Sequence, residues 1–258
     1  MTRRFAYYFP AVAVFVGVLG LWELAVRALS IQQFLLPPPS SIASAFVEHF
    51  DELMTVGRNT LVEAVGGLLI GGVAALVVAF ATARWATASR ALLPFAIAAN
   101  SVPIIAFAPI MNNWFGVLNP LSKMMVVAVL VFFPIMINTV RGLTLVDPAS
   151  LELMRSYAAS EISILLRLRI PNSLPFVFTA LKVSATLALI GAIVAEYFGG
   201  AQSVLGQYII TEAAFFRFAN AWAAVVVASA SSIAFFVIIL ALERLAIPSH
   251  ASARSPDA

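Results

Sequence analysis

Charged side chains that could bind a partner concentrate in one stretch of this sequence, from Asp147 to Pro175. Its charged residues are Asp147, Glu152, Arg155, Glu161, Arg167 and Arg169. Long apolar runs lie on either side, whereas the stretch itself is too polar to cross a bilayer. Carboxylate and guanidinium groups on such a segment form charge-assisted hydrogen bonds with another protein. We therefore expect a docking site for a water-soluble partner.

Start and stop signals divide this stretch into two short helices. Asp147 followed by Pro148 is typical of an N-cap and a first helical position. Ser160, with Glu161 next to it, predicts a second N-cap, where the helix dipole favours a carboxylate. Pro171 is expected to end the second helix, because its ring clashes with the preceding turn and it has no N–H to donate. The pattern predicts a helix–turn–helix.

The sequence holds no motif for catalysis or metal binding. It has no G-x-x-x-x-G-K-[ST] phosphate loop, no H-E-x-x-H and no G-x-S-x-G. It has no Cys, and its two histidines, His49 and His250, lie in polar segments. We therefore expect no enzyme activity, no metal and no cofactor on this chain. Gly66-Gly67 and Gly71-Gly72 lie in an apolar run, where close helix packing explains them better than phosphate binding.

Composition indicates that the elements around the polar stretch are membrane spans. Hydrophobic residues make up 62% of the chain and charged residues 10%, and the mean hydropathy is +1.00. Soluble domains are about half apolar and about a quarter charged. Six apolar segments have the length that a tilted helix needs to cross a bilayer: Tyr8–Leu29, Leu61–Ala81, Ala91–Ile110, Ser122–Val140, Pro175–Phe198 and Ala221–Leu242. The predicted fold class is an all-α integral membrane protein with six transmembrane helices.

Residues 1–58 are expected to hold the first span and a periplasmic amphipathic segment. The first span is too long for a signal-peptide core and should remain in the protein. Glu23 and Arg27 lie four residues apart near its end and predict an ion pair on one helix face. After Pro37–Pro39, a single amphipathic surface helix is predicted from Ser40. Its apolar positions are Ile42, Phe46, Phe50, Leu53 and Met54. This helix either lies in the headgroup layer or contacts a partner.

The distribution of Lys and Arg predicts which side of the membrane each loop faces. With a cytoplasmic N-terminus, the inner side receives Arg3, Arg4, Arg84, Arg90, Arg141, Arg155, Arg167, Arg169, Lys182, Arg244 and Arg254. The outer side receives Arg27, Arg58, Lys123 and Arg217. Eleven of the 15 basic residues then lie inside, so the positive-inside rule places both termini and the polar stretch in the cytoplasm. The same bias accounts for the net charge of +3 without a nucleic-acid partner.

Polar residues inside the spans are the candidates for a translocation path. They are Asn100, Ser101, Asn138, Ser184, Thr186, Ser229, Ser231 and Ser232. Hydrogen bonding between helices is the competing explanation, and the better one for most of them. Asn100 is favoured for the path because Pro103 and Pro109 follow it, and carbonyls freed by Pro are tolerated where helices line a cavity. Lys182 and Glu196, near opposite ends of one span, are either gates or anchored interfacial charges.

The polar stretch also carries an ordered pattern: Glu152-Leu-Met, three residues, Ala158, nine residues, then Leu168-Arg-Ile-Pro171. This pattern resembles the EAA loop of the permease subunits of bacterial ATP-binding-cassette (ABC) importers, which reads Glu-Ala-Ala, three residues, Gly, nine residues, Ile-x-Leu-Pro. Leu153 and Met154 replace the two alanines, and Ala158 replaces the glycine. Further motifs are similar to the nitrate, sulfonate and taurine branch, which also contains riboflavin and thiamine-pyrimidine-precursor permeases. They are Trp114-Phe-Gly, Phe133-Pro134, Pro171-Asn-Ser-Leu-Pro175 and Ala195-Glu-Tyr-Phe-Gly199.

The resemblance implies a type I ABC importer (MetI-like) permease fold in the inner membrane of a bacterial cell. Residues 59–245 would form the core permease domain, with the coupling loop at 147–171 and a cytoplasmic tail at 246–258. The residues implied to couple to an ATPase are Glu152, Arg155, Ala158, Ala159, Ser160 and Pro171. The implied partners are two ATPase subunits that bind ATP and Mg²⁺, a second permease copy forming a homodimer, and a periplasmic or lipid-anchored solute-binding protein.

The loop from Gly199 to Asn220 is too long for a simple turn, and its Gly and Phe pairs predict a short helix that dips back toward the outer surface. Together with Asn112–Phe115, it would meet the solute-binding protein. The alternative function is a secondary transporter of a small polar solute driven by an ion gradient. That class predicts inverted repeats and acidic groups at mid-membrane, whereas the carboxylates here cluster at span ends. The expected substrate is of the riboflavin, pyrimidine (thiamine-precursor) or nitrate, sulfonate and taurine type, and Asn112-Asn113-Trp114 and Leu181-Lys182 favour a vitamin precursor.

Overall fold

The computed structural model describes residues 2–83, 94, 98, 103 and 106–247, and in this part of the chain every regular element is a helix. The helices are α1 (Thr2–Ala28), α2 (Pro39–Glu48), α3 (Phe50–Ala83), α5 (Phe107–Phe115), α6 (Pro120–Thr144), α7 (Pro148–Ser156), α8 (Glu161–Ile164), the π-helix η2 (Leu165–Arg169), α9 (Ile170–Tyr197), α10 (Leu205–Ala214) and α11 (Phe218–Ala246). The predicted all-α class is confirmed.

Five helical segments are long and apolar enough to cross a membrane. They are Phe9–Ala28, Phe50–Thr82, Pro120–Thr144, Glu161–Tyr197 and Phe218–Ala246. Each overlaps one of the predicted spans. The first lies within the predicted Tyr8–Leu29, whereas the other four extend past a predicted boundary, because polar turns continue these helices beyond the apolar core. The expected third span, Ala91–Ile110, falls largely outside the described residues, so the count of six spans stays a prediction.

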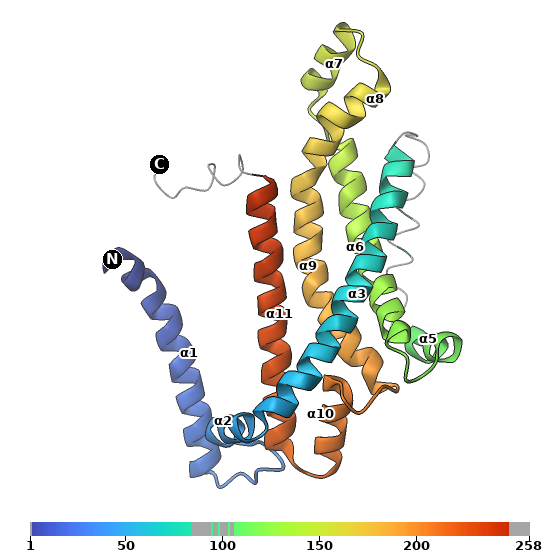
Figure 1. The fold of residues 1–258 in the computed structure, drawn as a ribbon. Helices are drawn as coiled ribbons and strands as arrows, with labels where there is room; N and C mark the ends of the chain where they lie inside the picture. Colours follow the sequence, from blue (N-terminus) through green and yellow to red (C-terminus); the bar gives the residue numbers. More distant parts are fainter. Residues whose placement is uncertain (1, 84–93, 95–97, 99–102, 104–105, 248–258) are drawn as a thin grey trace.

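The centre of the bundle consists of α3, α6 and α9, which lie side by side (Figure 1). A Cβ atom added to Gly67 would lie 2.4 Å from the Val127 Cβ, and one added to Gly71 would lie 2.3 Å from the Ala128 carbonyl oxygen. Gly191 of α9 is in similarly close contact with α6. Glycines therefore bring the three backbones together, which confirms helix packing as the role of this part of the glycine-rich run.

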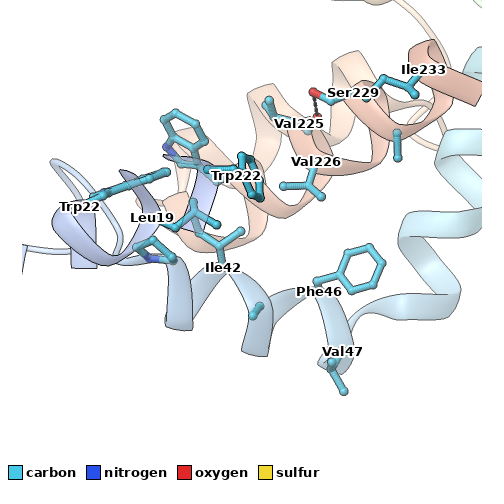
Figure 2. A pocket seen from close by; sticks show the side chains of 14 residues that line it. Leu19, Trp22, Ile42, Phe46, Val47, Trp222, Val225, Val226, Ser229 and Ile233 are labelled. Atoms are coloured by element: carbon cyan, nitrogen blue, oxygen red, sulfur yellow. Dashed lines mark hydrogen bonds between the residues drawn. The ribbon is translucent and has the colours of Figure 1, made fainter. Parts of the chain in front are cut away.

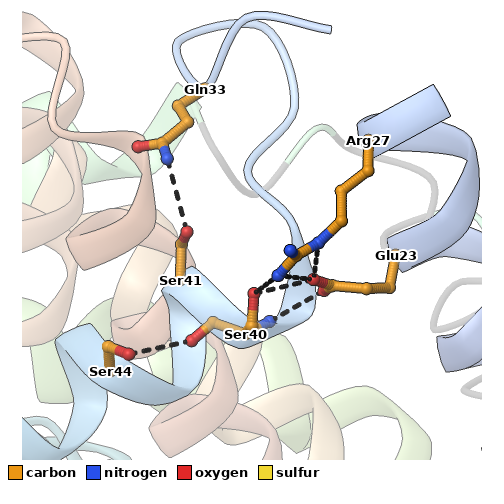
Figure 3. A network of polar contacts seen from close by, with 6 residues as sticks. All are labelled: Glu23, Arg27, Gln33, Ser40, Ser41 and Ser44. Carbon is orange, nitrogen blue, oxygen red and sulfur yellow. Dashed lines mark hydrogen bonds and ion pairs between the residues drawn. The ribbon is translucent and has the colours of Figure 1, made fainter. Parts of the chain in front are cut away.

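The N-terminal helix α1 stands apart from the bundle and is joined to it at one end through α2 (Figures 1 and 3). Glu23 Oε1 accepts hydrogen bonds from Arg27 Nε at 2.6 Å and from the Ser40 hydroxyl at 2.8 Å. Glu23 Oε2 accepts from the Ser40 backbone N–H at 3.0 Å. The predicted Glu23–Arg27 ion pair is confirmed, and the Glu23 carboxylate also binds the first turn of α2.

Between α1, α2 and α11 lies an apolar groove of about 720 Å³ (Figure 2). Its lining includes Trp22, Ile42, Phe46 and Trp222. The Trp22 and Trp222 rings meet edge to face, with centroids 5.5 Å apart. This lining offers almost no polar group that could orient a polar solute, so the groove is not part of the candidate translocation path.

The prediction of one amphipathic surface helix from Ser40 to Met54 is wrong. Helix α2 ends at Glu48, and His49 has φ −106° and ψ 24°, so the chain turns there before α3 begins at Phe50. Leu53 is fully buried in the bundle. The apolar spacing had two sources, because Ile42 packs in the short helix α2 and Leu53 belongs to the first turn of a long spanning helix.

The short helices gather at the two ends of the bundle (Figure 1). Helices α7 and α8 project from one end, beyond the tips of α6 and α9. Helices α2, α5 and α10 lie at the opposite end. The predicted short helix between Gly199 and Asn220 is confirmed as α10. A bilayer around the long helices would therefore separate α7 and α8 from α2, α5 and α10.

Candidate docking loop and buried polar cluster

The first helix of the projecting loop, α7, begins as the sequence predicts. The Asp147 carboxylate accepts hydrogen bonds from the backbone N–H groups of Ala149, at 3.4 Å, and Ser150, at 3.1 Å. The Ser150 hydroxyl donates to the same carboxylate at 2.8 Å. Hydrogen bonds from Ser150 therefore lower the pKa of the exposed Asp147 carboxyl below its ordinary value. This cap starts the helix sharply beyond the end of α6.

The turn between α7 and α8 depends on Ala158, which has a φ of +52°. Its N–H donates to the Arg155 carbonyl at 2.9 Å, and the Ala159 N–H donates to the Met154 carbonyl at 3.0 Å. The turn thus adopts the left-handed geometry that favours glycine, at the position where the EAA pattern has one. Ser160 then caps α8, because its hydroxyl oxygen accepts from the Ser163 N–H at 3.3 Å.

The second helix does not end at Pro171, so this prediction is wrong. Helix α8 continues through the π-helix η2 into α9 without a break. Pro171 lies in the first turn of α9, just after the π-helical hydrogen bonds. Bonds in a π-helix join residues five apart, instead of the four of an α-helix, so the pairing of N–H groups with carbonyl groups shifts by one residue there. The N–H that Pro171 lacks is then not required. The loop is consequently joined to a spanning helix by a continuous helical segment.

The base of the loop is held together by Asn172. Its side-chain amide donates to the Gly142 carbonyl at 2.8 Å and to the Leu145 carbonyl at 2.9 Å. A Cβ on Gly142 would lie 2.7 Å from the Ser173 Cα, so α6 and α9 are in backbone contact at this point. The two arms of the loop are therefore fixed to each other at their bases, and the C-terminal carbonyls of α6 are satisfied.

The outer surface of the loop is a mixture of charged and large apolar side chains. Leu153, Tyr157, Ile162 and Leu166 are 57, 79, 61 and 58% exposed. Glu152 and Arg155 are also exposed, and neither takes part in the ion pairs found among the described residues. This surface, here called the loop face, comprises Glu152, Leu153, Arg155, Tyr157, Ile162 and Leu166. Exposed apolar groups rimmed by charges are typical of a protein interface.

The predicted path residues do not form one site in the described part of the chain. Asn100 and Ser101 lie outside the described residues. Asn138 donates to the Pro134 carbonyl of its own helix at 2.8 Å. Lys182 Nζ donates to Glu243 Oε2 of α11 at 2.7 Å, which is a largely buried ion pair between two spans.

The remaining polar span residues differ in exposure. Ser184 is buried, whereas Thr186 and Ser229 are exposed and Ser231 and Ser232 are half-buried. The Ser229 hydroxyl donates to the Val225 carbonyl of its own helix at 2.9 Å. A bond of this kind satisfies the hydroxyl without a second helix.

Glu196 belongs to a buried polar cluster at the opposite end of the bundle from the loop. Here Glu196 Oε2 accepts from the Gly206 backbone N–H at 2.6 Å. The Thr60 hydroxyl accepts from the Leu205 N–H at 2.9 Å. Side chains of α9 and α3 therefore bind the first N–H groups of α10, which are the groups that a helix leaves without internal partners. Glu196 acts as an anchor for α10.

Two residues of this cluster, Glu63 of α3 and Lys123 of α6, were not among the predicted site residues. Lys123 is 2% exposed, and its ammonium group donates to Asn112 Oδ1 at 3.1 Å, to the Ser122 hydroxyl at 3.0 Å and to the Val117 carbonyl. Glu63, Lys123 and Glu196 are each the second or third residue from the end of a predicted span, where a single charge is tolerated. The sequence therefore contains no signal that the three form a cluster.

Asn112 also links α5 to the end of α9, because its side-chain amide donates to the Phe198 carbonyl at 3.1 Å. Nearby on this end of the bundle, Trp114, Phe215 and Phe216 are large and exposed. This arrangement brings together the two segments that were expected to form an outer surface.

Comparisons with known proteins give matches over most of the chain. A family model described as the binding-protein-dependent transport system inner membrane component matches residues 67–249. The chain is 29% identical to the formylaminopyrimidine transport permease protein ThiX of Halalkalibacterium halodurans over 91% of this chain and 93% of that protein. It is 28% identical to the riboflavin transport system permease protein RibX of Chloroflexus aurantiacus, over 91% and 88% respectively. A probable ABC transporter permease protein of Haemophilus influenzae is 29% identical over 76% of this chain and 79% of its own length.

Proposed function

Since the chain belongs to the family of binding-protein-dependent transport system inner membrane components, we propose that its loop 147–171 docks an ABC ATPase. The chain is a permease subunit of an ABC importer, and it is an all-α, multi-pass protein of the inner membrane. The predicted family and function are confirmed at this level. The family is the membrane component of such transporters, so ATP hydrolysis is assigned to a separate subunit.

The observation that carries the docking proposal is the loop face. Four large apolar side chains are more than half exposed on a segment that projects from the end of the bundle. Exposed apolar side chains beyond the spans gain free energy by burial against another protein, at about 25 cal/mol per Å². Glu152 and Arg155 would supply the charged rim that fixes the orientation of the partner. A folded ATPase domain suits this face, because the charge distribution of the sequence places the loop in the cytoplasm.

Motion of the docked ATPase would reach the spans through two rigid connections. One is the uninterrupted helical path from α8 through η2 into α9. The other is the Asn172 amide, which fixes the base of α9 to the last turn of α6. A rotation of α7 and α8 would therefore pass to α6 and α9 as a rigid-body movement. In this mechanism the permease couples ATP hydrolysis to transport and makes no bond itself.

The remaining partners follow from the same proposal. Two ATPase subunits, each with bound ATP and Mg²⁺, dock beneath a homodimer of this chain. A solute-binding protein delivers the solute to the end of the bundle that carries α5 and α10. Exposed Trp114, Phe215 and Phe216 support that assignment, because large aromatic side chains are enriched in protein interfaces. Both termini lie in the cytoplasm under this arrangement.

The proposed substrate is a small heteroaromatic vitamin precursor or a related compound. Its support is the extent of the match to relatives named for transport of formylaminopyrimidine and riboflavin, each over 91% of this chain. Uptake of these two compounds by cells that carry the complete transporter tests the proposal. Accumulation of sulfonate or nitrate in place of either compound would overturn it.

Replacing Glu152 with Arg tests the docking of the ATPase. The substitution reverses a charge on the rim of the loop face, and like charges placed across an interface cost several kcal/mol. We expect loss of co-purification with the ATPase and loss of uptake, while the permease itself still inserts and folds. Glu48→Arg is the matched control, because Glu48 is also exposed on a short helix but lies at the opposite end of the bundle.

Leu153→Asp is a second test, since Leu153 is 57% exposed and its replacement leaves no cavity in the bundle. It should weaken co-purification in the same way. Unchanged ATPase binding and uptake in both loop variants would show that this loop is not the docking site.

A further inference from the structure

Two buried carboxyl groups face each other where α3, α9 and α10 meet. Glu63 is 5% exposed and Glu196 is fully buried. Thr60, one helical turn before Glu63, binds the Leu205 N–H, and Glu196 binds the next N–H, that of Gly206. The two carboxyls are therefore neighbours, and they interact electrostatically. Ionised carboxylates only accept hydrogen bonds, so neither can donate to the other. Direct contact between two of them therefore requires a positive charge between the oxygens.

Each carboxyl of this pair has a buried oxygen without a hydrogen-bond partner. Within the described part of the chain, Glu63 Oε2 and Glu196 Oε1 are buried atoms without a hydrogen-bond partner. The other oxygen of Glu196, Oε2, is occupied by the Gly206 N–H. Buried polar atoms are rarely left unpaired, because each unpaired group costs about 1–3 kcal/mol. One free oxygen on each carboxyl is the expected arrangement of a small binding site.

The charges around the pair do not cancel. Lys123 of α6 is the cation that interacts electrostatically with both carboxyls. Its ammonium group is already bound to Asn112, Ser122 and Val117, and it forms no ion pair within 4.0 Å among the described residues. From α9, Tyr197 also lies near Glu196 but is neutral as a phenol. From α10 the neighbouring groups are the Gly206 N–H and the side-chain amide of Gln207, which donates to the Glu196 carbonyl. From α3 the neighbouring group is the Thr60 hydroxyl, so none of these groups is charged.

We propose that Glu63 and Glu196 bind one small monovalent cation, a proton or Na⁺, between their facing oxygens. Two carboxylates and one ammonium leave the cluster one positive charge short of neutrality, and a buried net charge is strongly unfavourable. A divalent ion would exceed the requirement and repel Lys123. The bound cation joins α3 to α9, and because Glu196 also holds the Gly206 N–H, it stabilises the position of α10. The site lies at the far end of the bundle from loop 147–171 and does not depend on ATPase docking.

The test measures the thermal unfolding of the complete transporter in lipid nanodiscs. One series varies pH between about 6 and 9 at constant Na⁺, and a second exchanges choline for Na⁺ between about 1 and 100 mM at constant pH. While the site is close to saturation, each tenfold fall in the concentration of free cation shifts the unfolding equilibrium about tenfold toward the unfolded state. The proposal predicts that the melting temperature falls as the binding cation is withdrawn.

Glu63→Gln separates this site from the other titratable groups of the transporter. Its neutral amide donates an N–H to Glu196 and removes one negative charge, so it replaces the cation without creating a cavity. The variant should lose the cation dependence and melt at the temperature of the fully loaded protein. Glu48→Gln is the matched control, because Glu48 is exposed and should keep the full dependence.

The two series identify the ion. A dependence on pH alone that Glu63→Gln abolishes identifies a proton, and a dependence on Na⁺ that it abolishes identifies sodium. The proposal is overturned if the wild-type transporter responds to neither ion. It is also overturned if Glu63→Gln keeps the cation dependence of the wild type, as the control Glu48→Gln should.

Discussion

Two adjacent glycines of α3 allow the packing of the bundle to be tested with a matched pair of substitutions. A Cβ on Gly71 would lie 2.3 Å from the Ala128 carbonyl oxygen and 2.7 Å from Val131 Cγ2. A Cβ on Gly72 would meet only Ile135 Cδ1, at 3.6 Å, which is an ordinary contact. Gly71→Ala therefore forces α3 away from α6, whereas Gly72→Ala fits the existing space. Both lie in the same turn of one helix.

The expected difference follows from two contributions. Replacing Gly by Ala in a helix stabilises it by about 0.5–1 kcal/mol, and this contribution is common to both variants. Overpacking costs about 1–3 kcal/mol and applies only to Gly71→Ala, because the nearest atom is backbone and cannot rotate away. The two variants should therefore differ by about 1–3 kcal/mol, which corresponds to melting temperatures about 2–12 °C apart for a chain of this size.

Thermal unfolding of each purified variant in nanodiscs, at one scan rate, measures this difference. Gly72→Ala should melt at or above the temperature of the wild type, and Gly71→Ala clearly below it. Equal melting temperatures for the two alanine variants would contradict the close contact of α3 with α6. A Gly72→Ala variant that melts below Gly71→Ala would show that the helix presents a different face to its neighbour.

Three further substitutions give distinct expectations. Asp147→Ala should increase hydrogen exchange of the first amides of α7. In the wild type, hydrogen bonds lower the pKa of Asp147, so the cap should persist as the pH falls to about 4. It should be lost only below that pH, as the carboxyl is protonated. Ala158→Gly should leave ATPase co-purification intact and stabilise the turn by about 1 kcal/mol, because glycine adopts a positive φ without strain. Ala158→Val should reduce co-purification, because a β-branched residue tolerates φ +52° worse than Ala. Removing one partner of the Lys182–Glu243 pair should lower the melting temperature more than replacing both with Met, because a single change leaves a largely buried charge unpaired.

Local signals in the sequence predicted much of the loop. Asp147 and Ser160 cap the two helices as expected, because capping depends on a side chain and the next few N–H groups. The prediction that Pro171 ends the second helix was wrong, because the effect of a proline depends on the hydrogen bonds of the residues before it. A π-helix upstream changed the hydrogen-bond register, and no pattern of residue types announces such a change.

Tertiary contacts explain what the sequence left unassigned. Glu63, Lys123 and Glu196 stand far apart in the chain, and each alone resembles an interfacial charge at a span end. Only the packing of α3, α6 and α9 brings them to the same depth. The exposed apolar residues of the loop face were missed because Leu153 and Tyr157 look like ordinary helix residues until the bundle is seen to leave them uncovered.

The position of the loop relative to the membrane is the direct test of the central claim. Because the chain has no Cys, single cysteines can be labelled with a membrane-impermeant maleimide in intact cells that lack the ATPase. Tyr157→Cys, at the most exposed of the four apolar residues of the loop face, should react only after the cells are permeabilised, whereas Phe215→Cys at the other end of the bundle should react from outside. Labelling of Tyr157→Cys in intact cells would place the loop outside the cytoplasm and contradict ATPase docking.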